Sequence, residues 1–148
     1  MTRDLPALRK QLEEFLRRHG NDGEPIALLG GESLPDSVAF EAVVMAYPKR
    51  RVVHLDGTLS LDEEAVQQGL LKAFAKNHIL LVTLTRKVGL EVFKPLEKFL
   101  AEGKLDVLKP WGWTTAEPSV DFRLIIHSRP GSFPFDDNVS LKFNLDTH

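Results

Sequence analysis

HILLVTLT, residues 78–85, is a nearly continuous run of apolar and branched side chains. A strand that is apolar on both faces is typical of a parallel sheet covered by helices on each side. Other segments with the pattern of strands lie before and after it, at 25–31, 51–57, 121–129 and 138–145. We therefore expect five strands in one sheet.

Helical patterns separate these strands. Residues 36–47 are apolar with small side chains. Ser60, with Glu63 three residues later, has the spacing of a capping box and predicts a helix that runs to about Asn77. Strands that alternate with helices predict parallel pairing. The fold class that we expect is a three-layer α/β sandwich with a sheet of about five strands.

The pattern is weaker after the central strand. A further helix is expected from near Glu91, because Pro95 fits only the first turn of a helix. Residues 103–118 indicate a loop or a small hairpin, and the WGW sequence inside this segment has two interpretations. Core packing and binding of a partner are equally compatible with it.

Residues 1–20 predict an N-terminal amphipathic helix ahead of a single α/β domain at 24–148. Asp4 is the expected N-cap and Gly20 the expected stop. The expected apolar face consists of Leu5, Leu8, Leu12, Phe15 and Leu16. This opening lacks the continuous apolar stretch of about seven residues that a secretory signal requires.

Composition excludes several classes of function. The chain has 148 residues, which suits one domain, and no cysteine, which removes disulfides, thiolate nucleophiles and cysteine-type zinc sites. Its 19 basic and 21 acidic residues nearly balance, so charge indicates neither nucleic acid nor a membrane as a partner. A cytoplasmic location is expected.

The turn after the first strand is where a phosphate-binding loop would lie. Gly30, Gly31 and Ser33 are present there, but the G-x-x-x-x-G-K-[ST] pattern is not. No lysine occurs between Lys10 and Lys49, so none nearby replaces the missing one. The sequence predicts at most a degenerate phosphate loop.

Two other strand ends support this interpretation. The strand at 78–85 ends in Thr83, Leu84 and Thr85, where a nucleotide-hydrolysing site needs an acidic pair for magnesium. His127 and Ser128 end another strand and can contact a phosphate only if the other elements are present. We therefore expect neither catalytic residues nor a cofactor.

The histidine positions do not indicate a metal site or a catalytic site. None has the paired spacing of metal ligands, so no metal is expected. His54 and Asp56 share one face of a strand, an arrangement that more often makes a structural pair than a catalytic dyad.

The C-terminal segment 121–148, DFRLIIHSRPGSFPFDDNVSLKFNLDTH, resembles the fifth AAA+ module of dynein heavy chains. Phe122 and Arg123 match the F-R pair of that family, and Arg129 matches its basic residue. Pro134 is followed by a phenylalanine, as in the family's proline–aromatic pair. The similarity extends upstream through GLEVFKPLEKFL to Arg51 and covers about two thirds of the chain.

This resemblance implies a structural module of a microtubule motor ring that neither binds nor hydrolyses nucleotide. Its partners would be neighbouring AAA+ modules or other protein surfaces, at the cytoskeleton or axoneme. We expect the interaction residues to include Arg123, Arg129, Trp111 and Trp113. The usual helical lid is not expected within these 148 residues.

Two alternatives remain open at this point. VVHLDGTLSLDEE at 52–64 resembles the opening of STAS regulatory domains, in which Thr85 would be the nearest regulatory hydroxyl. A mixed sheet would favour that interpretation, whereas a parallel sheet with the order 5-1-4-3-2 would favour the AAA+ one. The other alternative is an enzyme that uses Ser33 or His127.

Overall fold

The computed structural model describes residues 4–19, 23–30, 34–57, 61–85, 90–129, 134–139 and 141–144. Its helices are α1 (Leu5–His19), α2 (Asp36–Ala46), α3 (Glu63–Ala73) and α4 (Lys94–Glu102), with short 3-10 turns η2 (Leu90–Phe93) and η3 (Asp136–Asn138). Its strands are β1 (Ile26–Leu29), β2 (Arg51–Asp56), β3 (His78–Leu84), β4 (Leu105–Lys109), β5 (Gly112–Ala116), β6 (Arg123–Ser128) and β7 (Leu141–Asn144).

Five of these strands form one sheet in the order β2-β3-β6-β1-β7, and every neighbouring pair is parallel. With the β4–β5 hairpin left out, this is the order 5-1-4-3-2. The expected three-layer α/β fold is confirmed. The STAS-like alternative, which requires a mixed sheet, is wrong.

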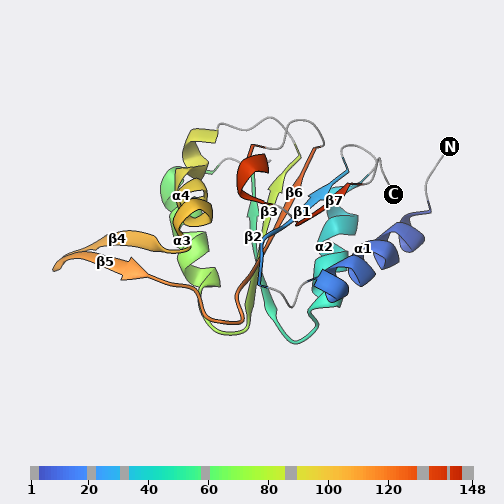
Figure 1. The fold of residues 1–148 in the computed structure, drawn as a ribbon, viewed down its shortest axis with the longest axis horizontal. Coiled ribbons are helices and arrows are strands. Elements are labelled where there is room, and N and C mark those ends of the chain that lie inside the picture. Colours follow the sequence, from blue (N-terminus) through green and yellow to red (C-terminus); the bar gives the residue numbers. More distant parts are fainter. Residues whose placement is uncertain are drawn as a thin grey trace.

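The side chains of the central strands alternate between two half-cores. Leu80 and Val82 of β3 pack in the cluster that includes α3 and α4, whereas Ile79 and Leu81 pack in the cluster that includes α1 and α2. Figure 1 shows the same division, with α1 and α2 on one side of the sheet and α3 and α4 on the other. The strand is apolar at consecutive positions because both of its faces are buried.

Helix α1 lies within the segment, 1–20, in which an N-terminal amphipathic helix is expected. Leu8, Leu12 and Leu16 are buried in the half-core that α1 shares with α2. The Ala7 N–H donates to Asp4 Oδ1 at 3.4 Å, as the expected N-cap requires. Gly20 lies outside the described residues.

The expected capping box before α3 is wrong. The N-cap is Asp62, whose Oδ1 accepts a hydrogen bond from the Ala65 N–H at 2.7 Å. Ser60 lies outside the described residues. The helix also ends earlier than expected, at Ala73 rather than near Asn77, which has a left-handed φ of 66°.

Helix α4 begins at Lys94, slightly later than the expected start near Glu91. Pro95 lies in its first turn, the position that proline tolerates. The preceding residues, 90–93, form the 3-10 turn η2 instead of an α-helix.

Residues 105–116 form an antiparallel hairpin, one of the two structures expected there. It projects from the α3–α4 side, well away from the sheet (Figure 1). A search of the described helices for one that is long and apolar enough to cross a bilayer finds none.

The Asp62 cap gives a testable difference from the sequence interpretation. Asp62→Ala removes the acceptor for the Ala65 N–H and should lower the free energy of unfolding by about 1 kcal/mol, as measured by urea denaturation. Ser60→Ala, which removes the cap that the sequence pattern indicates, should change it by less than about 0.5 kcal/mol. If Ser60→Ala lowered the free energy of unfolding more than Asp62→Ala does, Ser60 would be the N-cap and the capping box would be correct.

Candidate functional site

The candidate site lies at the carboxyl ends of the parallel strands, where open α/β sheets bind their ligands. Strand β1 ends there and turns through Gly30, whose N–H donates to the Ser128 carbonyl at 3.3 Å. A Cβ on Gly30 would lie 2.3 Å from Leu34 Cβ, so this turn accepts only glycine. Gly31 and Ser33, the other two residues of the expected degenerate phosphate loop, lie outside the described residues.

A group of polar residues, which we call the polar cluster, lies between these strand ends and helix α2. Its members are Asp36, His54, Thr83, Thr85 and His127. Thr83 and His127 are register partners in the pairing of β3 with β6. They face α2, because Leu81 and Ile125, each two residues earlier in the same strands, pack in the α1–α2 half-core.

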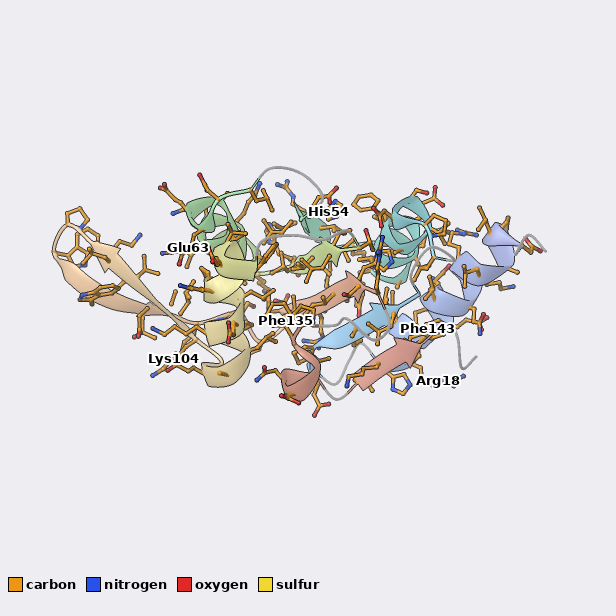
Figure 2. All side chains as sticks on the ribbon, turned by 90° about the horizontal axis from the view of Figure 1, so that it is seen from above. Arg18, His54, Glu63, Lys104, Phe135 and Phe143 are labelled. Atoms are coloured by element: carbon orange, nitrogen blue, oxygen red, sulfur yellow. The ribbon has the colours of Figure 1, made fainter. Side chains whose placement is uncertain are left out.

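Two short contacts tie the cluster together. His54 Nε2 lies 2.7 Å from Thr83 Oγ1, and the Thr85 hydroxyl donates to Asp36 Oδ1 at 3.0 Å. The ring of His54 also packs against Phe40 of α2, with the ring centroids 5.5 Å apart. Figure 2 shows His54 near α2. The cluster therefore holds α2 against the carboxyl ends of β2 and β3.

His127 is the least usual member. Its side chain is fully buried, and within the described part of the chain no group forms a hydrogen bond of good geometry with either ring nitrogen. Burial lowers the pKa of His127 to about 4, against the opposing effects of the Asp36 carboxylate, whose Oδ1 lies 3.4 Å from Nδ1, and of the Leu34 backbone. The ring is therefore neutral at pH 7 and makes no ion pair with Asp36.

The cluster is poorly suited to phosphate and magnesium. Asp36 occupies the first position of α2, so its carboxylate offers negative charge where a phosphate would approach the positive end of the helix. Thr83 and Thr85 provide hydroxyls at the end of β3 in place of carboxylates. No group of three metal-ligating side chains occurs among the described residues.

The expected interaction residues do not form one site. Arg123 begins β6 at the amino edge of the sheet, where its Nη1 donates to the carbonyls of Val120 and Phe122. Arg129 follows the other end of β6 and is exposed. Trp111 and Trp113 lie far from both, on the projecting hairpin.

The hairpin decides between the two interpretations of the WGW sequence. Trp111 is 78% exposed and Trp113 is 72% exposed, so core packing is wrong for both. Their exposure agrees with a contact surface, and neither residue lies near the polar cluster.

Sequence reasoning considered His127, Thr83 and Thr85 one by one and missed Asp36, which brings two of them together. A usable signal was present. Thr83, Thr85 and His127 interrupt otherwise apolar strands at positions of the same parity, which places them on one face. The first residue of the next helix to cover that face is the natural partner.

Comparison with known proteins supports the fold. RuvB, the Holliday junction branch migration motor of Thermotoga maritima, superposes with a TM-score of 0.58 at 12% identity, covering 95% of this chain and 44% of that one. Its P216G mutant gives 0.62 at 14% identity, covering 93% and 43%. NtrX from Brucella abortus, in complex with ATP, gives 0.61 at 14% identity, covering 92% and 36%.

The chain thus spans less than half the length of these structures. No protein-family model matches it, and no curated protein matches its sequence. What the similarities establish is the fold: this chain has the α/β fold of an AAA+ ATPase module.

Burial of His127 predicts a pH dependence of stability. The unfolded chain, in which the pKa of histidine is about 6.5, binds more protons than the folded chain between that pH and about 4. The free energy of unfolding should therefore fall by about 2 kcal/mol between pH 7 and pH 5, at up to about 1.4 kcal/mol per pH unit. Above pH 7 this contribution is constant.

His127→Leu should remove that slope and leave stability at pH 7 equal or higher, because it deletes two buried polar atoms that make no hydrogen bond of good geometry with the described residues. Urea denaturation at a series of pH values measures both effects. Val120→Ser, at a residue that is 99% exposed, serves as the control and should keep the wild-type slope. If the free energy of unfolding depended on pH in the same way for wild type and His127→Leu, the pH dependence would not come from His127.

Proposed function

We propose that this chain is a non-catalytic AAA+-like module of a dynein-type motor ring, which works by packing against neighbouring modules. One observation supports the non-catalytic role above the others. At the carboxyl ends of the strands, where an AAA+ nucleotide site would hold phosphate, the Asp36 carboxylate begins α2 and lies 3.4 Å from the buried ring of His127.

The physical argument is electrostatic. An active site of this type needs a lysine near the helix N-terminus and carboxylates at the end of the third strand. In this chain a carboxylate, that of Asp36, begins the helix, and neutral hydroxyl groups end β3. Nucleotide phosphates would meet repulsion at α2, and no carboxylate at the end of β3 would hold magnesium.

The dynein-type assignment is supported by where the resembling residues lie. Phe122 is buried and packs edge-on against Phe74 and Phe99, with ring centroids 5.5 Å apart in both pairs. Phe135, from the proline–aromatic pair, is buried in the same half-core. Residues that carry the resemblance thus serve the core of the fold, as expected for a shared module.

The rival enzyme interpretation loses its described candidate. The ring of His127 has no exposed surface, so a substrate cannot reach it in this conformation. Ser33, the other candidate, lies outside the described residues.

Nucleotide binding tests the proposal directly. Mg-ATP or Mg-ADP at a hundredfold excess over its dissociation constant would add about 2.7 kcal/mol and raise Tm by roughly 5–10 °C. We expect no shift in thermal unfolding and no saturable heat in calorimetry. An AAA+ ATPase with an intact lysine, measured in parallel, is the control. Saturable micromolar binding would overturn the non-catalytic role.

The packing role needs a separate test. Cross-linking mass spectrometry on the protein purified from its natural source should join lysines of this chain to sequences of AAA+ modules. An authentic AAA+ ring, cross-linked at the same protein concentration, is the control and should give links between its modules. If this chain gives only links within a single copy under those conditions, it is not a ring module.

A further inference from the structure

A groove lies between the β4–β5 hairpin and the helices beneath it. Its volume is about 290 Å³. Leu108 and Trp113 of the hairpin form one wall, and Lys94, Pro95 and Lys98 of α4 form the other. Leu108 and Trp113 are a cross-strand pair on one face of the hairpin, so their side chains make a continuous apolar surface.

This apolar wall is open to solvent. Leu108 is 63% exposed and Trp113 is 72% exposed, although the groove could bury both if it were filled. Large exposed side chains that gather along a concave surface mark a binding site. The groove has the shape and lining of a helix-in-groove site, in which an apolar stripe of a partner helix docks.

A helix with such a stripe lies on the opposite side of the same molecule. Helix α2 is apolar around most of its circumference, and its solvent-facing positions include Phe40, Val44 and Met45, exposed by 37%, 40% and 42%. Phe40 and Val44, four residues apart, lie along one stripe, which we call the α2 stripe, and Met45 flanks it on the side toward α1. A helix that is apolar all round is normally buried on every side.

The charges around the two surfaces are complementary. Glu41 lies exposed within the α2 stripe, and the groove offers Lys94 and Lys98, the second of which also lies 3.6 Å from Asp106. The groove also carries a negative charge that a basic residue near α2 could meet, because Glu63 lines it on the hairpin side of the sheet (Figure 2). Its counterpart is Arg9 of α1, which bonds to Met45 beside the stripe, whereas Arg17 already pairs with Glu13 at 2.6 Å.

One chain cannot bring these two surfaces together. The hairpin and α4 lie on one side of the sheet and α2 on the other, as both views show (Figures 1 and 2). We propose that the groove receives the α2 stripe of a second copy of this chain. This inference rests on the packing role proposed above and names its partner and its surfaces.

Such a contact is heterologous, since different surfaces of the two copies meet, and it leaves one groove and one stripe unused at the ends. The apolar side chains involved would bury on the order of 500 Å². Stable interfaces bury about 1,200 Å² or more in total, so the isolated contact should be weak. Linking copies in one assembly would strengthen it by raising their effective concentration.

Sedimentation velocity of the whole chain, from about 10 µM to about 1 mM, tests the proposal. Wild type should show a sedimentation coefficient that rises with concentration. The groove variant Leu108→Thr with Trp113→Thr should remain monomeric alone, and so should the stripe variant Phe40→Lys with Val44→Lys. An equimolar mixture of the two should associate again and stop at a dimer, because each dimer retains one intact groove–stripe contact.

Trp111→Thr is the matched control, since this equally exposed tryptophan does not line the groove. It should associate like wild type. Single substitutions, Trp113→Thr and Val44→Lys, replace the double ones if those fail to unfold cooperatively. A monomeric wild type, a mixture that stays monomeric, a stripe variant that self-associates, or loss of association in Trp111→Thr would overturn the proposal.

The two proposals fail separately. Absence of self-association would leave packing against modules of other sequence intact. Binding of Mg-ATP would overturn the non-catalytic role without affecting the concentration dependence of sedimentation.

Discussion

The parallel pairing of β3 with β6 is the constraint on which the rest of this structure depends. Both strands are central, so each contributes side chains to both half-cores, and Thr83 lies opposite His127 in their register. A slip of one residue would turn every side chain of a strand to the other face. It would bury the polar cluster against α3 and α4, where Leu80 and Val82 now pack. The register thus sets the core and the site together.

The polar cluster carries a stability cost that the rest of the core offsets. Thr83 and Thr85 each make a hydrogen bond, but within the described chain His127 has none, and such a buried group costs about 1–3 kcal/mol. Burial lowers the pKa of His127, so the imidazole there is neutral at pH 7. Natural proteins break local rules of folding most often at functional or strained sites.

Sequence patterns predicted the elements better than their ends. The five sheet strands, α1 and α2 were recoverable because burial of one or both faces leaves a strong periodic signal. The pattern points to Ser60 because Glu63 follows it by three residues, whereas Asp62 has Ala65 at that distance, and only the local geometry shows that Asp62 is the cap.

The site was less predictable than the fold. The missing lysine and acidic residues were readable because they depend only on residue type at strand ends. The contact of Asp36 with Thr85 joins residues 49 positions apart, and no local pattern contains it. The exposure of Trp111 and Trp113 was equally hidden, because a tryptophan in a short hairpin suits a core and a binding surface alike.

Helix α2 connects the two features that sequence reasoning missed. Its first residue, Asp36, is held by Thr85 at the carboxyl edge, and its exposed stripe begins about one turn later at Phe40. Phe40 also packs against His54, which in turn bonds to Thr83. These contacts hold α2 to the strand ends at its start and along one side. In the proposed assembly, a module that hydrolyses nothing would still pass a neighbour's displacement across its own sheet, because the docking stripe and the strand ends share this helix.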